Sequence, residues 1–556
     1  MSAVRGYVFG PLEKRGALAG LRLGQLVIFG VALVLALMIF SLSSVIGQGA
    51  LVIALGVLAG AVGLGFIQPG GRGVDEWIPV IFAWFMNSGN KAGWISTMPA
   101  IGDFSYEDLS NRISFENEPP QRGPRGRGQA ANARSARGGQ QRSRGMDSRG
   151  GKGSKGGKGG RGQVDPRLMS RALPPSLRGL KILDVPVAEG NTSIGVVKDE
   201  KSMLYTAVLA VRGDAFALLD AGEKARRLQS WADVLGSMAR PSSYVHRVQW
   251  IERAVPDDGD AFNRYLAEAK VQSDDAPTVR SYIDLLQEFG PISQQHETFI
   301  AVQISAASAG RIIKKAGGGD KGACLVLLRE VRQLMESLYG ADIHVDGALS
   351  PRLLSGVIRN AIDPLGRREL VRRGRRDPER AGASPKSAWP MATQTAWDHY
   401  RTERAYHATF WIAEWPRLEV GPDFMAPLMV RTQRIRTVSM VMQPIDPAKA
   451  QREVESAHTA YVSDEELRGR AGYMPNERRR RELEGVLRRE QELADGFSEY
   501  RFSGYVSVTG STIEELEEAC SEVEQSASQA HIELRRLYGE QDVAFSCVLP
   551  LCRGLN

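Results

Sequence analysis

Side chains that carry out chemistry are scattered in this sequence. The four cysteines are Cys324, Cys520, Cys547 and Cys552. A zinc site needs closely spaced Cys or His ligands, and a disulfide framework needs more cysteines. We therefore expect most of the protein to lie in a reducing compartment, and Cys547 and Cys552 to be small buried groups. His399 and His407 are eight residues apart, and we expect core or surface roles for them instead of metal ligation.

Motifs for catalysis are also missing. The sequence contains no G-x-x-x-x-G-K-[S/T] phosphate loop, no G-x-S-x-G and no H-E-x-x-H. Paired acids fall on one amphipathic helix predicted over residues 512–530, at Glu514, Glu515, Glu517 and Glu518. Such a helix is either simply solvated or docks a partner through its charge. We predict that the protein is not an enzyme and has no catalytic residue, cofactor or metal.

Positive charge is concentrated in residues 119–171. This stretch holds 14 Lys and Arg against two Asp, a net +12, so the rest of the chain sums to −5 (+7 less +12). Because it has almost no large apolar side chains, we predict a disordered linker between a membrane part and a soluble part. Three interpretations stay open: a plain spacer, contact with anionic lipids, or contact with nucleic-acid phosphates. The candidate contact residues are Arg125, Arg127, Lys152, Lys155 and Lys158.

Two uncharged runs near the amino terminus indicate membrane spans. The first begins at Leu23 and ends at Ile46, and the second begins at Ala50 and ends at Ile67. A bilayer core requires about 20 apolar residues in a helix, which predicts a transmembrane hairpin over residues 23–67. Basic residues flank the hairpin on both sides and its turn is uncharged, so both termini, including the segment 1–22, are expected in the cytoplasm. Small residues in the second run, Gly56, Gly60, Gly63 and Gly65, would allow close helix packing.

The juxtamembrane segment 68–118 contains the apolar stretch WIPVIFAWFM at residues 77–86, which is too short to span a bilayer. Its tryptophans favour a helix lying on the inner leaflet. A core element of the soluble part is an equally good interpretation.

The remaining chain alternates strand-like and helix-like patterns and is divided here into parts 172–365 and 366–556. Strands are predicted at 205–211, 245–252, 298–305, 407–415, 434–443, 500–509, 531–537 and 543–549. Helices are predicted at 221–238, 324–339, 512–530 and in a long region after Pro447. The predicted fold is α+β, with mostly antiparallel sheets covered by helices on one face.

The order of these parts resembles a known family. The opening FGPLEKRGALAGLRLGQ and the double span resemble the PrgI-like, VirB-type inner-membrane protein of type IV secretion systems. Segments between residues 206 and 551 resemble the amino-terminal, non-catalytic domain of VirB-type conjugation ATPases. These segments are YTAVLAVRGDAF, RTVSMVMQPIDPAKAQ, FSGYVSVTGSTIEELEEA and VAFSCVLPL. Similar fusions occur as type IV secretion-like membrane proteins of actinobacteria.

The resemblance implies a membrane-anchoring subunit in the bacterial cytoplasmic membrane. Its motor ATPase would be a separate chain, because the sequence ends at Asn556, where the motor domain of that family would begin. The expected partners are that ATPase and other membrane subunits, with anionic lipids or nucleic acid as further candidates. Two alternatives stay open: a membrane subunit of a type VII-like or other envelope assembly, and a membrane-tethered nucleic-acid-binding protein.

Overall fold

A computed structural model describes most of the chain outside the basic tract. The described residues are 23–41, 49–66, 73–86, 93–96, 169–170, 173–187, 193–213, 216–256, 294–416, 419–430, 434–470 and 477–555, with isolated positions between 277 and 284. The predicted linker, apart from its last residues, lies outside them, as do its five candidate contact residues.

The soluble part is built around one continuous sheet of 14 strands. Its strand order is β2-β1-β9-β10-β11-β13-β12-β6-β7-β5-β4-β3, with β14 beside β11 and β8 beside β5. Every pairing is antiparallel except β1 with β2. The predicted α+β class is therefore confirmed, although one sheet replaces the several that were expected.

The sheet contains the same supersecondary unit twice. The first unit is β5 (Leu204–Arg212), α7 (Ala221–Met238), β6 (Val245–Pro256), β7 (Gln294–Ser305), α10 (Gly310–Lys315), α11 (Gly319–Gly340) and β8 (His344–Ala348). The second is β11 (Ala405–Glu414), α14 (Ala426–Val430), β12 (Ile435–Pro444), β13 (Tyr500–Gly510), α17 (Ile513–Gln529) and β14 (Glu533–Arg536). Numbered within each unit, the strands lie in the order 4-1-3-2, the arrangement of a split βαβ fold. The sequence boundary at 365/366 falls between the two units.

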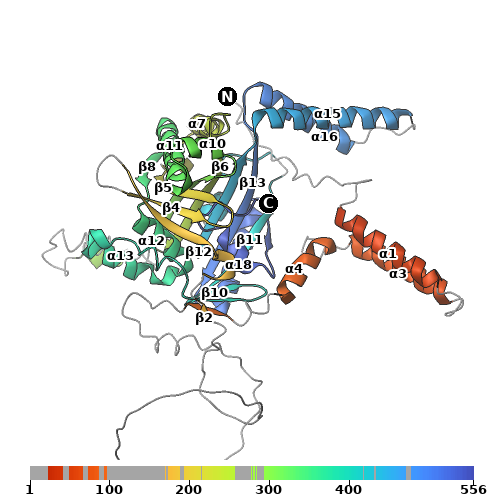
Figure 1. The fold of residues 1–556 in the computed structure, drawn as a ribbon, viewed down its shortest axis with the longest axis horizontal. Coiled ribbons are helices and arrows are strands. Elements are labelled where there is room, and N and C mark those ends of the chain that lie inside the picture. Colours follow the sequence, from red (N-terminus) through yellow and green to blue (C-terminus); the bar gives the residue numbers. More distant parts are fainter. Residues whose placement is uncertain are drawn as a thin grey trace, which may run out of the picture. The chain divides into compact units, whose positions relative to one another are not determined.

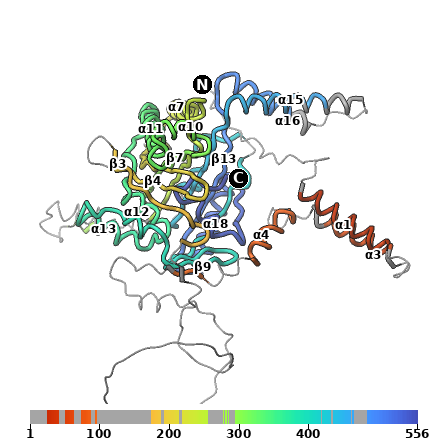
Figure 2. Tube along the Cα trace, viewed as in Figure 1, coloured from red at the N-terminus to blue at the C-terminus, as the bar shows by residue number. Residues whose placement is uncertain are grey.

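The units join edge to edge through their second strands. β6 and β12 pair antiparallel, with Ser439 opposite Ile251 near the middle of the ladder. Figure 2 shows the green and yellow first unit lying directly against the blue second unit. The junction removes two open sheet edges at once, which protects both units from pairing with other chains.

Both faces of the sheet are covered, so the expected single covered face is wrong. On β5, Ala207 and Leu209 pack beneath α7, α10 and α11, whereas Val208 packs toward α12 (Pro351–Ile362) on the other face. In the second unit α14 and α17 cover the first face. Figure 1 shows α7, α10 and α11 gathered over the first unit and α12 on its other side. Runs such as YTAVLAV are apolar without alternation because both sides of these central strands are buried.

The carboxyl-terminal segment lies on the face covered by α12. The strand predicted at 543–549 is wrong, because helix α18 (Gln541–Ser546) occupies its first half. Residues 547–555, the C-terminal strap, then cross the sheet. The side-chain Nε2 of Gln249, fully buried on β6, lies 2.9 Å from the carbonyl oxygens of Cys547 and Leu549. Its Oε1 accepts from the backbone N–H groups of Leu551 and Cys552 at 3.0 and 2.7 Å.

Short strands complete the edges of the sheet. On one side β4 (Ser193–Asp199) and β3 (Leu180–Pro186) extend the first unit, preceded by η3 (Pro175–Leu177). On the other side β10 (Tyr400–Thr402) and β9 (Ala392–Thr395) extend the second unit. The remaining elements are η4 (Phe216–Leu218), η6 (Pro364–Gly366), α13 (Arg367–Arg376), η7 (Pro378–Arg380) and a helical pair, α15 (Pro447–Arg470) and α16 (Glu477–Ala494).

Two short strands, one before the basic tract and one near its end, join the edge of the sheet. β1 (Trp94–Ser96) precedes the tract and pairs with β9, and β2 (Met169–Ser170), near the end of the tract, pairs with β1. Ile95 lies opposite Met169, so these two strands lie side by side. The two residues of β2 are a strand inside the range predicted to be disordered, and the rest of that prediction lies outside the described residues.

The apolar amino-terminal region forms two helices, α1 (Leu23–Ser41) and α3 (Gly49–Phe66), which lie side by side (Figure 1). By length and composition, one helix among the described residues, over Gly24–Ser41, suffices to cross a membrane. The apolar stretch Leu51–Gly63 is shorter, so the second span stays a prediction. The glycines do not form the contact, because a Cβ added at Gly56, Gly60 or Gly63 would meet nothing within 4 Å. The buried small residues are instead Ala32, Ala36, Ala54 and Ala61.

The hydrogen bonds of Gln249 generate a stability prediction. Gln249→Leu keeps the volume but leaves strap carbonyls and N–H groups buried without partners. We expect the free energy of unfolding to fall by about 2–4 kcal/mol, measured by urea titration of tryptophan fluorescence. The control Gln451→Leu lies on the exposed side of α15 and should change it by less than about 0.5 kcal/mol. Equal effects of the two changes would show that Gln249 does not hold the strap.

Candidate functional site

The acidic helix predicted from the sequence is α17, and its first turn is capped by side-chain hydrogen bonds that resemble a capping box. Thr512 is the N-cap and its side chain accepts from the Glu515 N–H at 3.2 Å. Glu515 in turn accepts from the Ser511 N–H at 2.9 Å. Hydrogen bonds from Ser511 lower the pKa of Glu515 below its ordinary value. This glutamate therefore serves the helix terminus and is a poor candidate for partner contact.

Two more of the four glutamates are held by arginines from neighbouring elements. Arg536 on β14 donates to both carboxylate oxygens of Glu517, at 2.8 and 3.1 Å, and its own side chain is only 8% exposed. Arg434 donates to Glu518 at 2.8 Å. Of the four glutamates, all of which the structure describes, only Glu514 is exposed without a hydrogen bond or ion pair. The acidic surface available to a partner is thus Glu514 with the outer side of Glu518.

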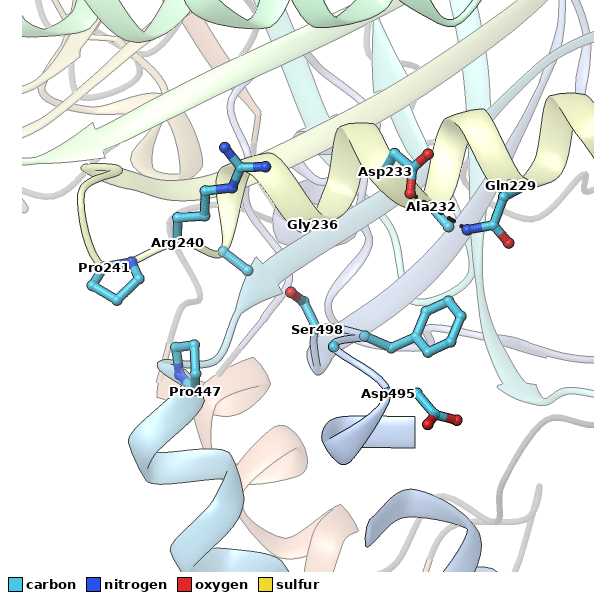
Figure 3. A pocket seen from close by; sticks show the side chains of 12 residues that line it. Gln229, Ala232, Asp233, Gly236, Arg240, Pro241, Pro447, Asp495 and Ser498 are labelled. Carbon is cyan, nitrogen blue, oxygen red and sulfur yellow. Dashed lines mark hydrogen bonds between the residues drawn. The ribbon is translucent and has the colours of Figure 1, made fainter. Parts of the chain in front are cut away.

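A cavity of about 430 Å³ opens where the two units meet the helical pair. Figure 3 shows the carboxyl end of α7 on one side and the start of α15 and the end of α16 on the other. Its polar lining comprises Gln229, Asp233, Arg240, Asp495 and Ser498. Gln229 donates to Asp233 at 3.4 Å, and no nucleophile–base pair lies in this lining. The lining of this cavity offers no reaction centre.

The cysteines and histidines that the sequence offered are structural. All four cysteines are buried and free, which confirms the burial expected for Cys547 and Cys552. Burial raises the pKa of Cys324 to about 11 and those of Cys520 and Cys547 to about 12, so the thiols stay protonated and unreactive at neutral pH. Across the described residues, no cluster of three or more His, Cys, Asp or Glu side chains is arranged to hold a metal ion.

His407 is a fully buried core residue on β11. Its ring nitrogens lie 2.9 Å from the hydroxyls of Thr402 and Thr509, and its ring contacts that of Phe545 at 4.4 Å between centroids. Burial lowers its pKa to about 4. His399 is half-buried beside Asp398. Both therefore have the core or surface roles expected for them.

A basic surface that was not predicted from the sequence lies on α13. Arg368, Arg372, Arg373 and Arg376 are exposed along this helix, and the carboxylate of Glu369 lies 3.9 Å from Arg373. Arg367 is buried instead, and it donates to Glu297 at 2.9 Å. The run RRELVRRGRR was the available signal. The exposed arginines of α13 are a second concentration of positive charge in the protein, in addition to the basic tract.

Comparison of the sequence with models of known protein families gives no match, and no curated protein matches it either. The function must therefore be argued from the residues and their arrangement.

The burial of His407 predicts an acid-sensitive step in stability. Its pKa is about 4 in the folded protein and roughly 6.5 in the unfolded chain, so protons bind the unfolded state first as pH falls. Stability from this residue is complete above pH 6.5 and is lost between pH 6.5 and 4, by about 2 kcal/mol at pH 5. His407→Gln should show a correspondingly smaller loss between pH 7 and 5 in urea titrations. His344→Gln, an exposed control, should follow the wild type. An unchanged pH dependence in His407→Gln would refute this assignment.

Proposed function

We propose that this protein is a non-enzymatic, membrane-anchored subunit of a bacterial type IV secretion or conjugation-like machine that recruits and positions a separate motor ATPase. The observation that carries the proposal is the direct connection between apolar helices and sheet. Only seven residues separate α4 (Val74–Met86) from β1, and β1 is hydrogen-bonded into the sheet. A large folded body joined this closely to hydrophobic helices is suited to holding a partner at a membrane.

The anchoring part of the proposal rests on α1 and α3. Their contact is lined by small residues, while large apolar side chains such as Val34, Met38 and Val52 are more than 60% exposed. A soluble protein rarely exposes so much contiguous apolar surface, whereas lipid would cover it favourably. With basic residues flanking both spans, the hairpin over residues 23–67 would place both termini in the cytoplasm.

The recruiting part rests on surfaces that lack reactive groups. Glu514 and Glu518 on α17 and the cavity below the helical pair are interaction features, and the described thiols and the His407 imidazole are buried. The resemblance to the non-catalytic domain of conjugation ATPases gives the class of partner. Other membrane subunits of the same machine would then contact the hairpin.

A second function is favoured by the arginines of α13. Exposed guanidinium groups at 368, 372 and 376 lie on one side of a helix, where they can contact the phosphates of nucleic acid or lipid. A membrane-tethered nucleic-acid binder would use this helix with the basic tract. If the protein has this second function, the full chain should retain DNA, and the amount retained should fall steeply as the salt concentration rises. The double substitution Arg368→Glu/Arg372→Glu should lower it as well.

Recruitment is tested by co-purification of the full chain with a candidate motor ATPase from the same organism. Glu514→Lys should reduce the recovered ATPase severalfold at low salt, because this charge would speed encounter and is screened by salt. Glu515, Glu517 and Glu518 are left unchanged, since their substitution would disturb the helix cap or remove the carboxylates that pair with Arg536 and Arg434. Glu336→Lys on α11, the counterpart of α17 in the first unit, is the matched control. No co-purification at any salt concentration would reject the recruiting role.

Anchoring is tested by the topology that it requires. A cysteine placed at Gln48 should react with a membrane-impermeant maleimide in intact cells, and one placed at Ser135 should react only after lysis. The native thiols are buried, so the unsubstituted protein supplies a low background. Labelling of Ser135 from outside would exclude the hairpin topology.

A further inference from the structure

Helix α4 packs one side against the sheet's edge. Trp77 stacks on Trp397 with ring centroids 6.0 Å apart, and Trp84 meets the same ring edge-on at 5.3 Å. Val80, about one turn from each tryptophan of α4, is only 6% exposed and lies against Gly539. Trp397 is itself fixed, because its carbonyl accepts from the Gly539 N–H at 2.6 Å. Trp77, Val80 and Trp84 are three and four residues apart, so they lie on one side of α4, and this side faces the sheet.

The opposite side of α4 is apolar and exposed. Ile78, Phe82 and Met86 follow one another at intervals of four residues and are 55%, 66% and 70% exposed, with Ile81 beside them at 41%. The charged residues of the helix are confined to its first turn, at Asp75 and Glu76. The first turn of this side lies near α1, where a Cβ added at Gly24 would meet the side chain of Asp75, whereas Phe82 and Met86 further along stay exposed. A helix with such an exposed apolar side needs a second apolar environment.

Chain length limits what that environment is. Residues 67–73 connect the end of α3 to the start of α4, and such a connection spans at most about 28 Å when fully extended. If α3 lies in the bilayer, α4 must therefore lie at or near its surface. The absence of Lys and Arg from the sequence of α4 makes apolar burial, and not attraction to anionic headgroups, the driving force.

We propose that α4 lies in the interfacial layer of the inner leaflet, with Ile78, Phe82 and Met86 in contact with lipid and with Trp77, Val80 and Trp84 clamped on Trp397 and its neighbour Gly539. The occupant of the exposed side is the lipid at the boundary between headgroups and acyl chains. The sheet is then held in one orientation at the membrane and does not swing on a long tether. This inference rests on the anchoring part of the proposed function.

The lipid contact is tested with spin labels in the full chain, reconstituted in phosphatidylcholine nanodiscs. Labels at Phe82→Cys and Met86→Cys should collide with oxygen more often than with a water-soluble nickel chelate. A label at Tyr339→Cys, 78% exposed on α11, should show the reverse order. Added salt should change neither result. Preferential collision with the nickel chelate at 82 and 86, or exclusion of both reagents by a covering protein surface, would overturn the proposal.

The clamp is tested by the distance between labels at residues 82 and 339 in the same nanodiscs. The distribution should be narrow in the wild-type background and several-fold broader after Trp397→Ala. The control Leu353→Ala removes a side chain that is 44% exposed on α12 and should leave the distribution narrow. A broad distribution in the wild type would overturn the clamp. Failure of the protein to insert into bilayers would reject the anchoring function itself, and the lipid contact with it. Insertion with a water-exposed α4 would reject only the present inference.

Discussion

The pairing of β6 with β12 is the constraint on which the rest of the soluble structure depends. It places the second strands of the two units at the centre of a single sheet, so both of these strands must be covered on two faces. Trp250, Met440 and Phe502 accordingly pack against the cores of both units. On the other face the C-terminal strap crosses the junction. The buried amide of Gln249 satisfies the strap's backbone where no neighbouring strand does so.

Much of this sheet was readable from the sequence, because long strands and amphipathic helices carry strong periodic patterns. Helix α7 was predicted with its observed bounds, and its N-cap, Asp220, accepts from the Glu223 N–H. The failure at 543–549 has a physical cause. A short apolar run is compatible with either a buried helix or a strand, and only tertiary contacts decide between them. Here Phe545 packs on Tyr400 and His407, which fixes a helical turn at that point.

The strands β1 and β2 and the ion pairs of the acidic helix α17 were not predicted, because the residues that they contact are distant in the sequence. Nothing local marks residues 94–96 or 169–170 as strands, since two or three residues gain their structure only by joining an existing edge. Similarly, the acidic character of α17 was evident, but Arg434 lies 84 residues before its partner Glu518. A charge pattern shows where an acidic surface can form. It does not show which of its charges are already neutralised within the fold.

The antiparallel junction also determines where the long connection after the second strand of each unit leaves the sheet. In both units the long connection follows the second strand, over residues 257–293 in the first and 445–499 in the second. Since β6 and β12 run in opposite directions, the end of β12 lies beside the start of β6. The helical pair α15–α16 therefore leaves the sheet next to the end of α7 from the other unit, and the cavity of Figure 3 forms between them. The lining of this cavity comes from both units. Binding of any partner there would therefore depend on how the two halves of the sheet are placed relative to each other.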